Sequence, residues 1–439
     1  SSMGGRKFGG GLGGGNGPSE PSCCKLSLMH SNGTLAAPPV RGLRNLGNSC
    51  YMNSVLQVLA ATGGVREHFL LQSEQETGAA PPPASEEVGS QLLTEAMRGF
   101  FWDLHCTGAA EDPVRPVGVL QAVSARHDRY ARRAEQDSHE MLRQLLEGLR
   151  TEMTDLKKAQ TPPKPPSAAK GKKTEEPRTL IDDLFSGELR SSIVCLSCGC
   201  VSCSHEPFLD LSLPIPSKAR RAAQLAAANS AEGGGTNADP FDEFKMDSAI
   251  EASSVLNLLP SDLRKPHDHM RLGACLQAFG APEALQGDNA YVCEACEKAA
   301  KERGEKPTGQ PALKWLQLSS VPRKLTLHLK RFRSTGRRTH KLDEHVPFPA
   351  RFDIGPFTCA AGAPVKHYSH LSGGGAPSAG MRLYGVIEHE GSFDGGHYIS
   401  YVRLQGGSQW YRMSDSIVKE VSEEVVLSKQ AFMLFYERE

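Results

Sequence analysis

One cysteine of this chain stands in a setting that suits nucleophilic chemistry. Cys50 follows Asn48 and Ser49 and opens a run with apolar periodicity that reaches Leu59. Asn and Ser are preferred at helix N-caps, so a helix should begin at or next to Cys50. Unpaired backbone N–H groups and the positive end of the helix dipole favour a thiolate there. The segment predicts a reactive thiol, although alone it suits a small cysteine packed at a helix start equally well.

The neighbours of Cys50 indicate where it faces and what assists it. The expected apolar face of the helix consists of Met52, Val55, Leu56 and Leu59. Cys50 lies roughly opposite, so its thiol should look out of the helical layer. Asn45 lies upstream and could form an oxyanion hole with the Cys50 backbone N–H, where one donor is worth about 10²–10³ in rate. The alternative is an Asn that serves the turn with Gly47.

A thiol nucleophile needs a histidine base that is distant in sequence and close in space. His397 follows Gly395 and Gly396 and opens the β-rich run 398–402. Glycines before a strand permit a tight turn and let a substrate chain pass close to the backbone. We therefore expect His397 to be the base, whereas His389 and His345 lack this setting.

A third group should orient the imidazole from a neighbouring strand or turn. Ser414 and Asp415, which follow the run 410–413, are the two options. A carboxylate would hold the tautomer and stabilise imidazolium better than a hydroxyl. Spacing does not decide which of the two faces His397.

Two Cys-x-x-Cys pairs, Cys195/Cys198 and Cys293/Cys296, suit a tetrahedral four-cysteine zinc site. Cys200 and Cys203 form a rival for the first pair. A redox dithiol is disfavoured because no thioredoxin-like βαβ pattern surrounds either pair. We expect one structural zinc and no cofactor for catalysis.

The composition of the chain indicates which partners and which cellular compartment the protein suits. Lys+Arg and Asp+Glu both total 50, so charge gives no signal for nucleic acid or an anionic membrane. No apolar run of about 18 residues predicts a membrane span. The twelve cysteines of this 439-residue chain, without a secretory signal pattern, favour a reducing intracellular compartment, cytoplasmic or nuclear.

The periodic segments predict how these residues are positioned. Residues 50–60 and 135–150 have helical apolar spacing, and strand-like runs dominate from about 180 onward. Helices first and strands later indicate an α+β enzyme with its site between the two layers. The ordered domain should span 41–439. The composition outside the periodic segments predicts a disordered lead and three disordered insertions, at 1–40, about 155–178, about 217–268 and about 369–379.

Several of these segments together resemble the ubiquitin-specific proteases. Residues 42–59 are similar to the Cys box of that family, and residues 384–401 with 410–415 are similar to its His box. The run Glu-Gln-Asp-Ser-His-Glu at 135–140 is similar to the family motif Gln-Gln-Asp-x-His-Glu. The runs 327–332 and 431–438 match further family segments, and all occur in family order from about residue 41 to the end of the chain.

The resemblance implies a papain-like hand, with a helical thumb over about 41–180 and with β-rich fingers and palm over about 181–439. It implies Cys50 as nucleophile, His397 as base and Asn45 as oxyanion donor. The channel for the C-terminal tail of ubiquitin would be lined by Gln136, Asp137, Gly395, Gly396 and Tyr398, with Asp137 pairing with an arginine of that tail. The family spacing also favours Cys195/Cys198 over the rival cysteine pair.

One departure from the family pattern concerns Ser414. Most members have Asp or Asn there, whereas the Ser-Asp sequence resembles the subgroup of ubiquitin-specific proteases sixteen and forty-five. The expected function is hydrolysis after the C-terminal glycine of ubiquitin by a monomer that binds ubiquitin and ubiquitinated proteins. The alternatives are an inactive ubiquitin-binding module, a protease for a ubiquitin-like modifier, and a zinc-ribbon nucleic-acid binder, which the balanced charge does not support.

Overall fold

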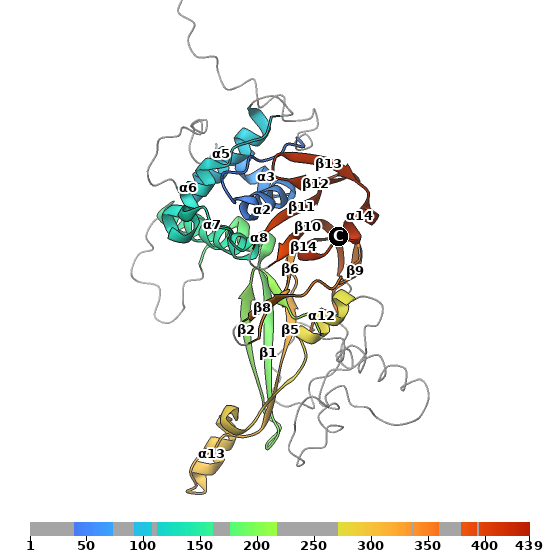
Figure 1. The fold of residues 1–439 in the computed structure, drawn as a ribbon. Coiled ribbons are helices and arrows are strands. Elements are labelled where there is room, and N and C mark those ends of the chain that lie inside the picture. The colour runs from blue at the N-terminus through green and yellow to red at the C-terminus, as the bar shows by residue number, and fades with distance from the viewer. Residues whose placement is uncertain are drawn as a thin grey trace, which may run out of the picture.

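The computed structural model describes residues 39–72, 92–107, 112–160, 176–216, 271–335, 338–359, 379–392 and 395–439. Within these ranges helices occupy the first part of the chain and strands most of the remainder, which confirms the predicted α+β class (Figure 1). The expected disordered lead and the insertions at about 217–268 and 369–379 lie outside the described residues, except for positions 39, 40 and 379.

The helical layer precedes the first long strand. It comprises α2 (Cys50–Ala61), α3 (Val65–Glu67), the π-helical turn η1 (His68–Gln72), α5 (Leu93–Cys106), α6 (Val117–Arg126), η2 (Asp128–Arg132), α7 (Ser138–Gln160) and α8 (Leu180–Phe185).

Helix α7 confirms one sequence prediction and corrects another. Its predicted apolar face is fully buried and consists of Leu142, Leu145, Leu146 and Leu149. The helix runs on to Gln160, so residues 155–160, which were expected in a disordered insertion, are helical. Lys157 and Lys158 lie in its last turn, where cations interact favourably with the helix dipole.

The central sheet has the strand order β13-β12-β11-β10-β14-β6-β3, with β9 paired to β10. Its strands are β3 (Leu211–Leu213), β6 (Lys324–Leu329), β9 (Arg351–Asp353), β10 (Gly380–Ser392), β11 (Gly395–Arg403), β12 (Trp410–Ser414), β13 (Ile417–Val421) and β14 (Ala431–Arg438). The β-rich run expected at 398–402 is confirmed within β11, as is the dominance of strands from about residue 180 onward among the described residues. Helix α14 (Glu423–Leu427) connects β13 to β14.

A second sheet, with the order β2-β1-β5-β4, projects away from the other layers (Figure 1). It contains β1 (Gly187–Cys195), β2 (Val201–Phe208), β4 (Glu283–Leu285) and β5 (Ala312–Ser320), and η3 (Gly287–Asn289) follows β4. Helix α13 (Glu294–Glu302) lies at its far end (Figure 1). The smaller elements are α12 (Arg271–Phe279), η4 (Gly355–Phe357) and the hairpin of β7 (Phe332–Thr335) and β8 (Arg338–Lys341).

Helix α2 lies between the other helices and the central sheet. It packs against α7 on one side and against β10, β11 and β12 on the other. All twelve of its residues are buried, and Cys50 is only 5% exposed. The predicted core face is right, and Cys50 faces out of the helical layer as expected, toward β11 of the central sheet, which buries it.

Candidate functional site

The loop before α2 delivers Cys50 at the first position of the helix, as predicted. Positive φ angles at Gly47 (102°) and Asn48 (51°) turn the chain into the helix. Ser49 is the N-cap residue, but its Oγ accepts from the backbone N–H of Leu46 at 2.8 Å and makes no side-chain cap. The backbone N–H of Cys50 is among the helix donors without an intrahelical partner.

The sulfur of Cys50 lies against β11. The backbone N–H groups of Tyr398 and Tyr51 donate to it and lower its pKa, but burial, the largest influence, raises the pKa of the thiol above its usual value. The negative charges of Asp415 and Glu135 raise this pKa further. Burial of the thiol therefore opposes the thiolate that the helix start and the two N–H groups favour.

His397 and its neighbour Ser414 come from adjacent strands. His397 is half-buried in β11 and directly precedes Tyr398, whose N–H points at the Cys50 sulfur. Its Nε2 lies 2.9 Å from Oγ of Ser414 in β12. The choice that spacing left open between two orienting groups thus has a geometric answer: the hydroxyl of Ser414 contacts the imidazole.

Asp415 binds the cysteine loop instead. Its Oδ2 accepts from Asn45 Nδ2 at 2.9 Å, and its Oδ1 accepts from Asn53 Nδ2 at 2.8 Å. Its backbone oxygen accepts from the N–H of Leu43 at 2.8 Å. Asp415 therefore ties the segment after Ser414 to both sides of the Cys50 loop.

The side chain of Asn45 is fixed at both ends of its amide. Its Oδ1 accepts from the backbone N–H groups of Gly47 at 2.9 Å and Ser49 at 3.2 Å. An amide NH₂ has two donors, and Asp415 takes one of them. The turn-stabilising role and the capacity to donate to a substrate are thus compatible.

The two glycines before His397 differ. A Cβ on Gly396 would lie 2.2 Å from His389 Nε2 and 2.5 Å from the oxygen of Glu390, so packing within the sheet requires glycine there. A Cβ on Gly395 would meet only Glu135, at 3.9 Å. Gly396 is therefore required by packing, whereas the space beside Gly395 is open except for Glu135.

The two competing histidines have other surroundings. His389 is buried beneath Gly396, and burial, together with the charges of Lys341 and His397, lowers the pKa of its imidazole to about 4. A lowered pKa makes this imidazole a weak proton acceptor, and Gly396 covers it, so His389 is poorly suited to act as the base. His345 packs near Phe348 in the segment before β9, with 6.4 Å between the ring centroids.

The expected tail-binding residues gather beside this centre. Asp137 caps α7, since its Oδ1 accepts from the N–H groups of His139 at 2.7 Å and Glu140 at 3.2 Å. Tyr398 is buried, with its ring 4.6 Å from that of His389. Gln136 is half-buried between Glu135 and Asp137.

Sequence reasoning missed two contacts at the centre. Glu135 accepts from the N–H of Gly396 at 3.1 Å through Oε2. Asn53 binds Asp415 from within α2. Asn53 falls in the Cys box and Glu135 in the Gln-Gln-Asp-like motif, so the motifs contained both residues without revealing their partners.

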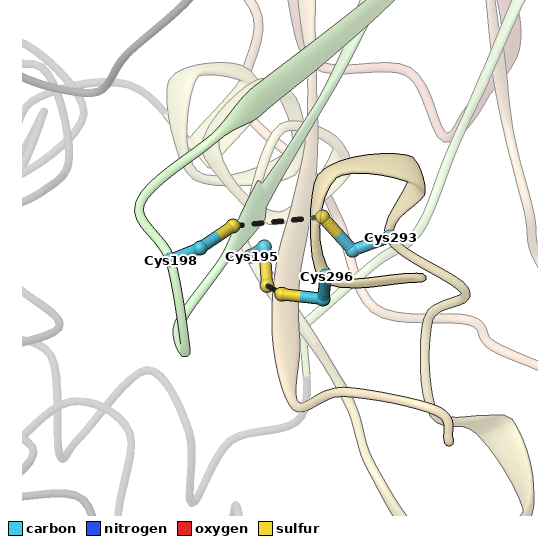
Figure 2. A group of neighbouring side chains, drawn as sticks. All are labelled: Cys195, Cys198, Cys293 and Cys296. Carbon is cyan, nitrogen blue, oxygen red and sulfur yellow. Dashed lines mark hydrogen bonds between the residues drawn. The ribbon is translucent and has the colours of Figure 1, made fainter. Parts of the chain in front are cut away.

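The four predicted cysteine ligands meet at the far end of the projecting sheet (Figure 2). All four sulfurs lie within 4.8 Å of one another, with Cys195 to Cys296 at 3.8 Å and Cys198 to Cys293 at 3.6 Å. Four Zn–S bonds of 2.3 Å would place the sulfurs about 3.8 Å apart. This group could hold a metal ion, whereas Cys203, from the rival pair, contacts Ser192 at 3.6 Å.

None of the helices in the described ranges is long and apolar enough to cross a membrane.

Comparison with known sequences matches residues 41–436 to the family described as ubiquitin carboxyl-terminal hydrolase. The chain is 29% identical to ubiquitin carboxyl-terminal hydrolase 2 of Rattus norvegicus, over 96% of this chain and 57% of that protein. It is 27% identical to ubiquitin C-terminal hydrolase 22 of Arabidopsis thaliana, over 91% of this chain and 64% of that protein. The chain therefore spans less than two thirds of the length of these relatives.

Comparison with solved structures finds the same fold. The structure titled as the SAGA Ubp8/Sgf11/Sus1/Sgf73 DUB module bound to ubiquitin aldehyde matches with a TM-score of 0.64 and 22% identity, covering 92% of this chain and 70% of that one. The module bound to monoubiquitin matches with a TM-score of 0.63. The hand-like arrangement expected from the sequence is thus confirmed at the level of the fold.

Proposed function

Because the chain belongs to the ubiquitin carboxyl-terminal hydrolase family, we propose that it is a cysteine-type deubiquitinase, which hydrolyses the bond after the C-terminal glycine of ubiquitin. One observation carries the proposal above the others. The backbone N–H that points at the Cys50 sulfur belongs to Tyr398, the residue directly after His397. This contact supports a nucleophile on α2 that is served by a base on β11, between the two layers.

The geometry supports a general-base mechanism. The contact of His397 Nε2 with Ser414 leaves Nδ1 to take the proton of the Cys50 thiol. Because burial keeps the thiol protonated, that proton moves as the sulfur attacks the glycine carbonyl carbon. His397 then gives the proton to the leaving lysine amine, and a thioester remains on Cys50. Water, activated by His397, attacks the thioester and releases ubiquitin with a free carboxylate.

The oxyanion of each tetrahedral intermediate needs donors that are already in place. We assign this role to the backbone N–H of Cys50 and the second N–H of Asn45, whose amide is held by Asp415. Asp415 is a positioning residue in this scheme, and Ser414 positions His397.

We assign the tail channel to the residues beside this centre. Gln136, Asp137, Gly395 and Tyr398 would line it, while Gly396 gives the backbone its close packing on His389. The half-buried carboxylate of Asp137 has one oxygen engaged in capping α7, which leaves the other for an arginine of the tail.

We propose zinc as the metal of the four-cysteine group. Four thiolates in tetrahedral reach are the donor set that structural zinc prefers, and the ligands would be Cys195, Cys198, Cys293 and Cys296. The ion would close two loops at the end of the projecting sheet and stabilise a surface for ubiquitin.

The partners proposed are ubiquitin and ubiquitinated proteins, bound by a monomer in the reducing cytoplasm or nucleus. Placement near ubiquitin-specific proteases sixteen and forty-five rests on the Ser-Asp sequence at 414–415 and on the similarity of segments 184–189, 206–213 and 383–389. The relatives named above are hydrolases 2 and 22.

Ubiquitin that carries a C-terminal electrophile tests the function. The wild-type protein should form a covalent adduct, and Cys50→Ala should form none while it still binds ubiquitin. A folded wild type without an adduct would leave only a binding module. An adduct formed instead with a ubiquitin-like probe would favour a protease for that modifier.

A further inference from the structure

A loop of the helical layer contacts the strand that carries His397. Residues 133–137 connect η2 to α7, and Glu135 extends from this loop to the start of β11. Its Oε2 accepts from the backbone N–H of Gly396 at 3.1 Å. Gly396 directly precedes His397, so this bond joins the helical layer to the sheet one residue from the base.

The same loop also contacts the segment that carries the nucleophile. Asn48 Nδ2 donates to the backbone oxygen of Arg133 at 3.0 Å. Arg133 lies two residues before Glu135, and Asn48 lies two residues before Cys50. A short run of chain thus links the Cys50 loop to the His397 strand.

Backbone strain is concentrated at the same place. Among the described residues, the non-glycine residues with positive φ are Asn48 (51°), Arg133 (51°) and Asp415 (50°). Asn48 and Asp415 flank the cysteine and serine of the site, and Arg133 opens the linking loop. Left-handed backbone at such residues persists only where the surrounding structure enforces it, typically at functional sites.

The other strand of the β10–β11 pair, β10, is held by a lysine of the strand β8. Lys341 Nζ donates to the backbone oxygens of His389 at 2.6 Å and Gly391 at 2.8 Å. Lys341 therefore fixes β10, while Glu135 fixes the first residues of β11 to the helical layer. Glu135 is also the one group that an added Cβ at Gly395 would approach, at 3.9 Å.

Position 135 also departs from the family motif, which has Gln where this chain has Glu. The side-chain oxygen of either residue can accept from a backbone N–H. The hydrogen bond therefore depends on the length of this side chain and on its oxygen, and either Glu or Gln supplies both. The negative charge of Glu135 has a separate effect, since it raises the pKa of the Cys50 thiol.

We propose that Glu135 is a positioning residue for the cysteine hydrolase reaction: by accepting from the Gly396 N–H it fixes the start of β11, and with it His397, against the loop that carries Cys50. This inference rests on the function proposed above. It assigns no contact between Glu135 and the reacting atoms.

Two substitutions separate the hydrogen bond from the charge. Glu135→Ala removes both, and Glu135→Gln removes the charge and retains an acceptor of the same length. With a fluorogenic C-terminal conjugate of ubiquitin, we expect Glu135→Ala to lower kcat about 10-fold with little change in KM, because small displacements of catalytic groups are costly. Glu135→Gln should stay within about 3-fold of the wild type.

A second readout follows the charge alone. The rate of Cys50 alkylation by iodoacetamide as a function of pH, measured on the Cys50 peptide by mass spectrometry, reports the pKa of the thiol. Both variants should lower that pKa, because each removes a carboxylate while Asp415 remains. A loss of kcat confined to Glu135→Ala, with the same pKa decrease in both variants, supports positioning through the hydrogen bond.

Other results overturn the proposal. An equal loss of kcat in both variants would assign the effect to charge, and wild-type kcat in Glu135→Ala would show that the bond does not position His397. A rise in kcat/KM for Glu135→Ala would mean that the side chain obstructs the channel. The control is Glu147→Gln, which neutralises an exposed carboxylate paired with Arg143 on α7. A wild type that cleaves no conjugate refutes the proposed function itself.

Discussion

The catalytic site proposed around Cys50 and the four-cysteine group at the far end of the projecting sheet hold their side chains together by different means. Each gathers side chains from segments that are far apart in the sequence. In the catalytic site, the gathered residues are held by other protein groups: Asp415 holds Asn45, and Ser414 contacts His397. At the far end, the four sulfurs approach mainly one another.

Burial is less uniform at the far end. Cys50 is 5% exposed and covered by two layers, and Cys195 and Cys293 are as buried, at 0% and 4%, but Cys198 is exposed and Val292, beside Cys293, is 61% exposed. The catalytic site can therefore keep its geometry by packing and hydrogen bonding. The four-cysteine group, called the outer site below, has little apolar core around it and depends on a bound ion for its stability. Structural zinc contributes about 10–16 kcal/mol of apparent binding energy to folding.

Removing the Asp415 carboxylate should have the largest effect on the catalytic site. Asp415 has a positive φ, so Asp415→Gly deletes the carboxylate without backbone strain. The amides of Asn45 and Asn53 then lose their acceptor, and kcat should fall about 100-fold as one oxyanion donor is misplaced. The measurement is kcat on a fluorogenic ubiquitin conjugate.

Asp415→Asn is the matched variant. It tolerates the left-handed backbone and keeps one oxygen that can accept from Asn45. Its kcat should stay within about 10-fold of the wild type. If Asp415→Gly kept full activity, Asn45 would not depend on this contact or would not donate to the oxyanion.

Removal of one cysteine ligand from the outer site should weaken the binding of ubiquitin more than it slows the chemical step at Cys50. Cys198→Ser removes one sulfur of the four, so the bound metal should be lost and the thermal midpoint should fall. We expect KM for the ubiquitin conjugate to rise about 10-fold, with kcat changed less than about 3-fold, because Cys50 lies in the separate catalytic site. Metal content by mass spectrometry and steady-state kinetics measure the two effects.

Cys203→Ser is the control for that experiment and also tests the rival ligand pair. Cys203 contacts Ser192 and lies outside the four-sulfur group. The variant should keep its metal and its KM. Metal loss in Cys203→Ser but not in Cys198→Ser would reverse the assignment of ligands.

Local patterns predicted the elements and the motif residues because these depend on near neighbours. The helix start at Cys50 and the buried leucines of α7 follow from spacing and end preferences. The pairing of Cys195/Cys198 with Cys293/Cys296 was favoured by family spacing and agrees with the geometry.

What the sequence patterns could not supply is tertiary packing. The helix start favours a thiolate at Cys50, but β11 buries the thiol, and burial raises its pKa. Gly396 was expected beside a substrate channel, and the structure adds that a Cβ at this position would meet His389. The division of roles between Ser414 and Asp415 depends on which loop each one meets across the catalytic site.

The smallest expected effect concerns Ser414. Its hydroxyl contacts Nε2 of His397, and a neutral hydroxyl stabilises imidazolium less than a carboxylate does. Ser414→Ala should therefore lower kcat by about 3–10-fold, and Ser414→Asn, which supplies an amide oxygen to the same nitrogen, should restore it. A decrease below about 3-fold, equivalent to about 0.6 kcal/mol, would reduce the catalytic site to a Cys–His dyad.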